Sequence, residues 1–182
     1  MFENQTLSDF HNFEYNTIFI KMKNKNFFLI SAVVPITDET FSLKKTVLTL
    51  INENDKYLKE IIIVASKKIT TINSLKEAKK LKLRYKKKIQ IIFQKKPFFG
   101  GAMIDGFSRM KGTHLLMIAS DLETHPKEVK KMIKELKKND EVIIGASRWL
   151  KKGGFEGYNN IKFILNFFFK FFFKILFFSN LT

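Results

Sequence analysis

The sequence predicts an α/β fold built on a mostly parallel central sheet. Short apolar, β-branched runs recur along the chain, and each is followed by a segment with apolar residues at helical spacing. These runs contain so few polar residues that strands formed from them must be buried on both faces, which requires helices on both sides of the sheet. The hydrophobic fraction of 45% is enough for a packed core, and 182 residues suit one domain.

The expected strands and helices alternate from residue 27 onward. The strands are expected at 27–35, 60–65, 88–94, 113–119 and 140–146. The helices are expected at 40–54, 74–83, 101–111 and 126–138. The last helix has a proline in its first turn and an apolar face formed by Val129, Met132, Ile133 and Leu136. Ligands of parallel sheets bind at the carboxyl ends of the strands, so the loops that follow the strands should hold the site.

The two ends of the chain differ from this central pattern. Residues 1–26 place acidic residues ahead of any apolar stretch, and no small-residue cleavage site follows one, so we do not expect a signal peptide. We expect a polar extension at 1–26, a domain at 27–157 and a hydrophobic helix at 158–182.

Charge and cysteine content limit the classes of function. The formal net charge of +16 favours polyanionic partners, although lysine as the default surface residue explains the charge equally well. The basic run Lys76–Lys88 suits a solvated helix face or a binding patch, and no aromatic platform for nucleic acid is interleaved with it. Nucleic acid is therefore not an expected partner. The absence of cysteine excludes disulfides, thiolate metal sites and cysteine nucleophiles.

Two carboxylates, Asp121 and Glu123, follow the expected strand at 113–119. Alternate side chains of an extended segment point the same way, so both can converge on one cation. Mg²⁺ typically takes one or two carboxylates together with substrate phosphates, and such a cation neutralises a departing diphosphate. The alternative is that both acids merely precede a helix, where negative charge is favourable.

The segment Leu115–Pro126 (LLMIASDLETHP) resembles the metal motif of family-2 inverting glycosyltransferases, especially polyprenyl-phosphate (dolichyl-phosphate) mannosyl- and glucosyltransferases. Asp121 matches the second acid of that motif, Glu123 matches a later polar position, and Ala119 replaces the first acid. The resemblance implies a Rossmann-like nucleotide-diphospho-sugar transferase (GT-A) fold, with Mg²⁺ or Mn²⁺ held by Asp121 and Glu123.

Other segments resemble the same family in the same order. The turn at 33–39 matches the nucleotide-binding turn, the Gly100-Gly101 pair matches the loop and helix before the metal strand, and 145–154 matches the acceptor loop. The donor nucleotide would then contact Pro35, Thr37, Glu39, Ser66, Gly100, Gly101, Ser120 and Asp121. The acceptor loop would comprise Arg148, Trp149, Gly153 and Gly154. Arg148 can pair with a phosphate and is assigned to catalysis together with Asp121.

The resemblance implies transfer of a sugar with inversion from a nucleoside-diphosphate sugar to a polyprenyl phosphate or to a cell-surface glycan or lipid. A phosphate acceptor is already anionic, whereas a hydroxyl needs a base, for which His125 is a candidate despite its expected structural role at a helix N-cap. The family usually has base-reading acids where this chain has Ala65-Ser66-Lys67. Together with Ala119 and an expected C-terminal truncation, this leaves an inactive nucleotide-binding remnant as an alternative, and a basic nucleic-acid-binding protein as a third hypothesis.

The tail at 161–181 is rich in Phe, Ile and Leu, with a polar residue at every fourth position: Lys162, Asn166, Lys170 and Lys174. Such a stripe favours a helix in the membrane interface with lysines reaching toward headgroups. A single membrane span and burial against a remainder of the protein are the alternatives. We expect the chain at the cytoplasmic face of a membrane, as a peripheral protein or with one anchor.

Overall fold

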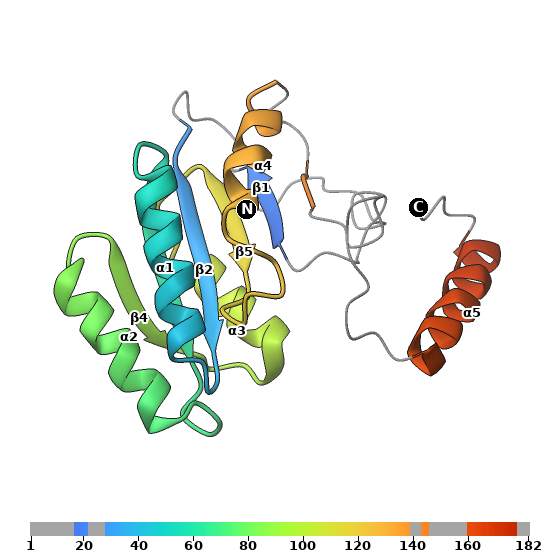
Figure 1. Cartoon of the computed structure of the whole chain (residues 1–182), viewed down its shortest axis with the longest axis horizontal. Coiled ribbons are helices and arrows are strands. Elements are labelled where there is room, and N and C mark those ends of the chain that lie inside the picture. The colour runs from blue at the N-terminus through green and yellow to red at the C-terminus, as the bar shows by residue number, and fades with distance from the viewer. Residues whose placement is uncertain (1–16, 22–27, 139–142, 146–159, 178–182) are drawn as a thin grey trace. The chain divides into compact units, whose positions relative to one another are not determined.

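The computed structural model describes residues 17–21, 28–138, 143–145 and 160–177 (Figure 1). The chain divides into two compact units, 16–146 and a second that joins 1–15 to 147–182. The first unit contains a five-stranded sheet in the order β1-β5-β2-β3-β4. The strands are β1 Thr17–Lys21, β2 Ile30–Ile36, β3 Leu58–Ala65, β4 Ile89–Phe93 and β5 His114–Ile118.

Strands β2, β3, β4 and β5 run parallel to one another, as the sequence predicts, and helices lie between them along the chain (Figure 1). The helices are α1 Phe41–Asn54, α2 Ile72–Arg84, α3 Phe98–Phe107 and α4 Glu128–Leu136. The predicted α/β fold class is therefore confirmed.

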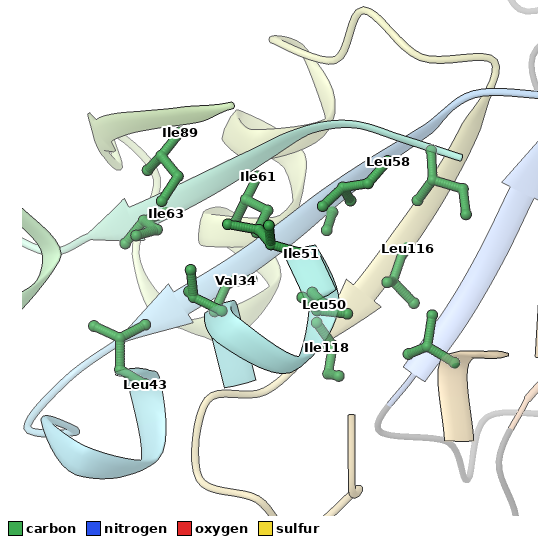
Figure 2. Close-up of a cluster of buried hydrophobic side chains, with 14 of the residues drawn as sticks. Val34, Leu43, Leu50, Ile51, Leu58, Ile61, Ile63, Ile89, Leu116 and Ile118 are labelled. Carbon is green, nitrogen blue, oxygen red and sulfur yellow. The ribbon is translucent and has the colours of Figure 1, made fainter. Parts of the chain in front are cut away.

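Alternation along the strands builds two apolar clusters, one on each face of the sheet. On one face, residues of β2, β3 and β5 pack with α1, α2 and α4, as Figure 2 shows for Val34, Leu50 and Leu116. On the other face, Val33, Ile62 and their neighbours pack against α3. Because successive strand residues point to opposite faces, a strand that is apolar throughout serves both clusters.

The ends of two helices follow from local sequence. The side chain of Thr71 caps α2 by accepting a hydrogen bond from the Ser74 backbone amide at 3.3 Å. Helix α4 buries the apolar face expected from its spacing, comprising Val129, Met132, Ile133 and Leu136. Helix α3 begins three residues earlier than expected, so the Gly100-Gly101 pair lies inside its first turn.

Residues 17–21 correct the expectation that 1–26 forms an extension ahead of the fold. They form β1, which pairs antiparallel with β5 from Thr17 opposite Ile118 to Lys21 opposite His114. An unpaired edge of β5 would leave a row of backbone donors and acceptors exposed, and this short β-branched segment satisfies them. The fold thus begins before residue 27.

The expected strand at 140–146 lies mostly outside the described residues. Of this segment 143–145 is described, and Ile144 packs against the cluster shared with α1 and α4. The expected domain boundary at 157 also lies outside the described residues.

The second unit is described only through α5, Asn160–Phe177. This helix falls within the hydrophobic segment expected at 158–182. Its described apolar side chains, among them Phe168 and Phe171, are largely exposed. Among the helices of the described residues, none is both long and apolar enough to cross a membrane.

Candidate functional site

The carboxyl ends of the parallel strands meet at one edge of the sheet, and hydrogen bonds join the loops that follow them. Ser120 Oγ, after β5, donates to the carbonyl oxygen of Pro35 in β2 at 2.8 Å. Thr71 N, after β3, donates to the carbonyl oxygen of Thr37 at 2.7 Å. The structure thus brings the predicted donor residues Pro35, Thr37 and Ser120 to one edge, with Ser66 directly after β3.

The turn after β2 is held by its own carboxylate. Glu39 Oε2 accepts a hydrogen bond from the Thr37 backbone amide at 2.6 Å. On the neighbouring loop, the Ser66 amide donates to Thr70 Oγ1 at 2.7 Å, and that hydroxyl donates to the carbonyl oxygen of Ile36 at 2.8 Å. Thr70 therefore connects the two predicted nucleotide loops, a role that was not predicted from the sequence. The available signal was a threonine pair immediately ahead of a helix.

The turn that carries Asp121 and Glu123 is not extended, which corrects the premise of alternation along a strand. Leu122 has φ 69°, in the left-handed region, and Asp121 Oδ1 accepts a hydrogen bond from the Glu123 amide at 2.9 Å. Both acidic residues are exposed at the carboxyl edge. The side chain of Asp121 is therefore oriented by a local turn, because that hydrogen bond fixes one of its two oxygens.

The acids of this turn lie too far from α4 to serve as its N-terminal charges. Helix α4 begins at Glu128, which is itself the acidic residue of the first turn. The favourable effect of negative charge is confined to that first turn, so it does not explain Asp121 or Glu123. His125 Nδ1 accepts a hydrogen bond from the Lys127 amide at 3.2 Å. The N-cap residue of α4 is Lys127, so the expected place of His125 at the helix N-cap is wrong by two residues.

The chemistry of the two carboxylates fits a divalent cation that completes its shell with substrate oxygens. Hard cations take oxygen ligands, and Mg²⁺ often uses only one or two carboxylates beside the phosphates it binds. Ala119 supplies no side-chain ligand, and among the described residues there is no group of three or more His, Asp or Glu placed to hold a metal alone. A metal in this turn would depend on the bound diphosphate.

The two glycines at the start of α3 have different surroundings. A Cβ added to Gly101 would lie 2.4 Å from the carbonyl oxygen of Lys96, whereas one added to Gly100 would meet nothing within 4 Å. Gly101 therefore permits close packing of the chain on itself, and Gly100 remains open to a ligand. Asp105 fixes the same loop, because its Oδ2 accepts from the amides of Lys95 at 2.5 Å and Lys96 at 3.1 Å.

These hydrogen bonds hold the pKa of Asp105 below its usual value. The bond from the Lys95 amide has the larger effect and the bond from the Lys96 amide the smaller. A cavity of about 70 Å³ lies beside this loop and is lined by Ile92, Phe93, Lys95, Asp105, Ser108 and Arg109. It is far smaller than a pocket for a sugar nucleotide, and none of the predicted donor or metal residues lines it. The open carboxyl edge is therefore the better candidate site.

Arg148, Trp149, Gly153 and Gly154, the predicted acceptor loop, lie outside the described residues. The role expected for Arg148 in catalysis therefore stays a prediction. Asp121 is the predicted catalytic residue that the structure describes.

Comparison with known proteins agrees with this arrangement. The sequence profile described as "Glycosyl transferase family 2" matches residues 31–181. A search of curated proteins finds no match. The matched range begins in β2, includes every loop at the carboxyl edge and extends through α5. It covers well over half of the chain. The chain therefore belongs to glycosyl transferase family 2, whose enzymes transfer a sugar from a nucleotide-sugar donor to an acceptor.

Proposed function

We propose that this glycosyltransferase is a hexosyltransferase that acts with inversion on a lipid-linked phosphate at a membrane surface, with Mg²⁺ or Mn²⁺ at Asp121 and Glu123. The observation that carries this proposal is the hydrogen bond from Ser120 Oγ to the carbonyl oxygen of Pro35. It joins the loop that carries the two acids to the turn that resembles the nucleotide-binding turn. A diphosphate lying along that turn would therefore be next to the carboxylates.

The donor would be held mainly by backbone and short side chains at the ends of β2 and β3. The Glu39 carboxylate accepts a hydrogen bond from the Thr37 amide, so its role is to hold the shape of the turn. Ser66 follows β3 where the family usually has acids that read the base, and Lys67 and Lys68 come next. Neither lysine is an acid that could read the base, so the identity of the base is undetermined.

Asp121 and Glu123 would hold the divalent ion against the diphosphate oxygens. The ion supplies positive charge that stabilises the departing nucleoside diphosphate. The Glu123 amide orients the Asp121 carboxylate before any ligand arrives, so less ordering is needed on binding. With two side-chain carboxylates and no third acid at Ala119, metal affinity should rise strongly when the nucleotide is present.

A phosphate acceptor suits the described part of this edge better than a hydroxyl does. An acceptor hydroxyl needs a base to remove its proton, and the candidate His125 already accepts a hydrogen bond through Nδ1. A phosphate oxygen is anionic at neutral pH and needs no base. The predicted role of Arg148, pairing with a phosphate in a forked geometry, is consistent with the same acceptor.

We place the protein at the cytoplasmic face of a membrane, with α5 lying in the interface as a peripheral anchor. The apolar composition of Asn160–Phe177 supports this proposal, since a helix so rich in phenylalanine gains free energy by leaving water. Burial of α5 against other protein is the alternative. It predicts that the purified chain does not partition onto vesicles.

A second candidate function is a nucleotide-binding protein of the same family that lacks turnover. Ala119, where the motif has its first acid, favours it, because the remaining carboxylates must hold the metal without that ligand. Binding of a nucleotide sugar without product formation, in the presence of Mn²⁺ and a polyprenyl phosphate, would favour this candidate over the first.

The proposed function is tested by calorimetry of the full chain with UDP-, GDP- and dTDP-sugars, each with and without Mg²⁺ or Mn²⁺. We expect one donor to bind in a metal-dependent manner, and Asp121→Asn to weaken that binding at least tenfold. Glu128→Gln is the matched control, because this acid lies in α4 and away from the turn. Binding of no donor, or equal binding by Asp121→Asn, would contradict the proposal.

A further inference from the structure

The loops after β3 and β4 form a surface in which each pair of lysines is followed by exposed apolar side chains. We call residues 66–72 and 94–99 the basic–apolar rim; their sequences are SKKITTI and QKKPFF, and neither contains an acid. The exposed lysines and large apolar side chains of the rim are Lys67, Lys68, Ile69, Ile72, Lys95, Lys96, Phe98 and Phe99. The proposed donor chemistry does not explain its apolar half, since a sugar nucleotide offers little apolar surface.

The two loops are neighbours at the carboxyl edge. Strands β3 and β4 are adjacent and parallel, and the backbone amide of Gln94 donates to the carbonyl oxygen of Ala65 at 2.9 Å. The exposed acids of this edge, Asp38, Asp121 and Glu123, follow β2 and β5 instead. The edge is therefore divided into an acidic half after β2 and β5 and a basic, apolar half after β3 and β4.

The rim keeps an apolar side chain in solvent at a cost in backbone energy. Phe98 has φ 62° and is 83% exposed. Gln94 Nε2 donates to the carbonyl oxygens of Lys96 at 2.8 Å and Phe98 at 3.3 Å, which holds the loop in place. Left-handed backbone at a phenylalanine is unfavourable and persists only where its surroundings impose it, which is typical of functional positions.

We propose that the basic–apolar rim docks on the surface of an anionic membrane. Its four lysines outnumber Asp105, the acid whose carboxylate accepts from the Lys95 and Lys96 amides, so the rim complements anionic headgroups. The exposed Phe and Ile side chains suit the boundary with the acyl chains. Phe98 and Phe99 offer stacking surface, but aliphatic Ile69 and Ile72 do not, and this mixed apolar surface favours lipid over single-stranded nucleic acid. Docking by this half of the edge turns the adjoining acidic half toward the bilayer, where a lipid-linked acceptor would be presented.

This inference deepens the proposed function by naming a surface that meets the lipid, and its test needs neither donor nor metal. The full chain is sedimented with phosphatidylcholine vesicles, with and without phosphatidylglycerol. A lysine near an anionic surface contributes about 1 kcal/mol, or about fivefold in partitioning. We therefore expect Lys95→Gln/Lys96→Gln to weaken partitioning onto anionic vesicles about 25-fold and to leave partitioning onto neutral vesicles unchanged.

The apolar half is tested by Phe98→Ser/Phe99→Ser, which should reduce partitioning about tenfold or more on both vesicle types. The matched controls lie on α2 away from the rim: Leu83→Ser, which is similarly exposed, and Lys79→Gln/Lys82→Gln. Because α5 is unchanged in every variant, its own contribution to partitioning is common to all of them. Far-UV circular dichroism confirms that each variant is folded.

A fluorescence measurement gives a second readout. In a Trp149→Phe background, tryptophan introduced by Phe98→Trp should shift to shorter wavelength on anionic vesicles and be quenched by brominated lipid, whereas Leu83→Trp should not. Rim variants that partition like the unmodified chain would overturn the proposal. So would rim variants that lose only binding to UDP, which would assign the lysines to the nucleotide. Absence of glycosyl transfer by the unmodified chain, with its vesicle binding intact, would contradict the proposed function alone.

Discussion

Glu60 is expected to stabilise the domain from the end of the sheet opposite the candidate site. It lies near the start of β3 and is only 4% exposed. Its Oε1 accepts hydrogen bonds from Ser31 Oγ at 2.9 Å and from the Lys111 amide at 2.6 Å, and its Oε2 accepts from Gln90 Nε2. The Gly112 amide also donates to Ser31 Oγ, at 2.8 Å. One carboxylate thus connects β2, β3, β4 and the segment before β5.

Glu60→Ala should lower the free energy of unfolding by about 3 kcal/mol. The substitution removes the acceptor of three donors, and a buried donor left unpaired costs about 1–3 kcal/mol. The Ser31 hydroxyl can rotate toward another acceptor, and water can reach the half-buried Gln90. The Lys111 amide keeps a longer hydrogen bond to Ser31 Oγ, at 3.2 Å. The total loss of free energy is therefore well below the sum of the costs of three unpaired buried donors.

Urea denaturation followed by circular dichroism measures this loss, and Glu60→Gln provides the matched control. The glutamine keeps one acceptor oxygen for Ser31 and Lys111, and its amide nitrogen can donate to Gln90 once that side-chain amide reverses. We expect this variant to lose only about 1 kcal/mol. An alanine variant within about 1 kcal/mol of the unmodified chain, or a glutamine variant less stable than alanine, would refute the reasoning.

Three further predictions concern the loop between β4 and α3. Gly101→Ala should lower stability by about 1–3 kcal/mol in thermal melts, because its Cβ would lie 2.4 Å from the Lys96 carbonyl oxygen, whereas Gly100→Ala should be neutral or stabilising. The pKa of Asp105 is lowered by hydrogen bonds from loop amides, so its stabilising effect is present above its unfolded pKa and is lost as pH falls through its folded pKa. In Asp105→Asn, the free energy of unfolding should therefore fall less steeply below about pH 4, as measured by urea denaturation at several pH values. The same pH dependence below about pH 4 in the variant and the unmodified chain would contradict this. Phe98→Gly should raise the free energy of unfolding by about 0.5–1 kcal/mol, because glycine adopts φ 62° without strain. The same variant should partition more weakly onto vesicles. A variant that is less stable than the unmodified chain would argue against strain at Phe98.

The sequence by itself determined the alternation of strands and helices and the faces that they bury. The apolar face of α4 and the doubly buried run of β3 follow from periodicity, which is a local property of the chain. The meeting of Pro35, Thr37 and Ser120 at one edge follows from the same pattern, because parallel strands end on the same side of a sheet. The resemblance rested chiefly on the segment Leu115–Pro126 and the turn at 33–39, and the match over residues 31–181 confirmed membership of family 2.

Tertiary structure decided the features that depend on residues far apart in the chain. Segment 17–21 became a strand because β5 offered it an unpaired edge, and nothing local to those residues indicates that partner. The left-handed backbone at Leu122 opposes the intrinsic preference of leucine, so the turn that orients Asp121 had to be imposed by its surroundings. Periodicity is a property of neighbours in sequence, whereas edge pairing and strained turns are set by contacts between distant residues.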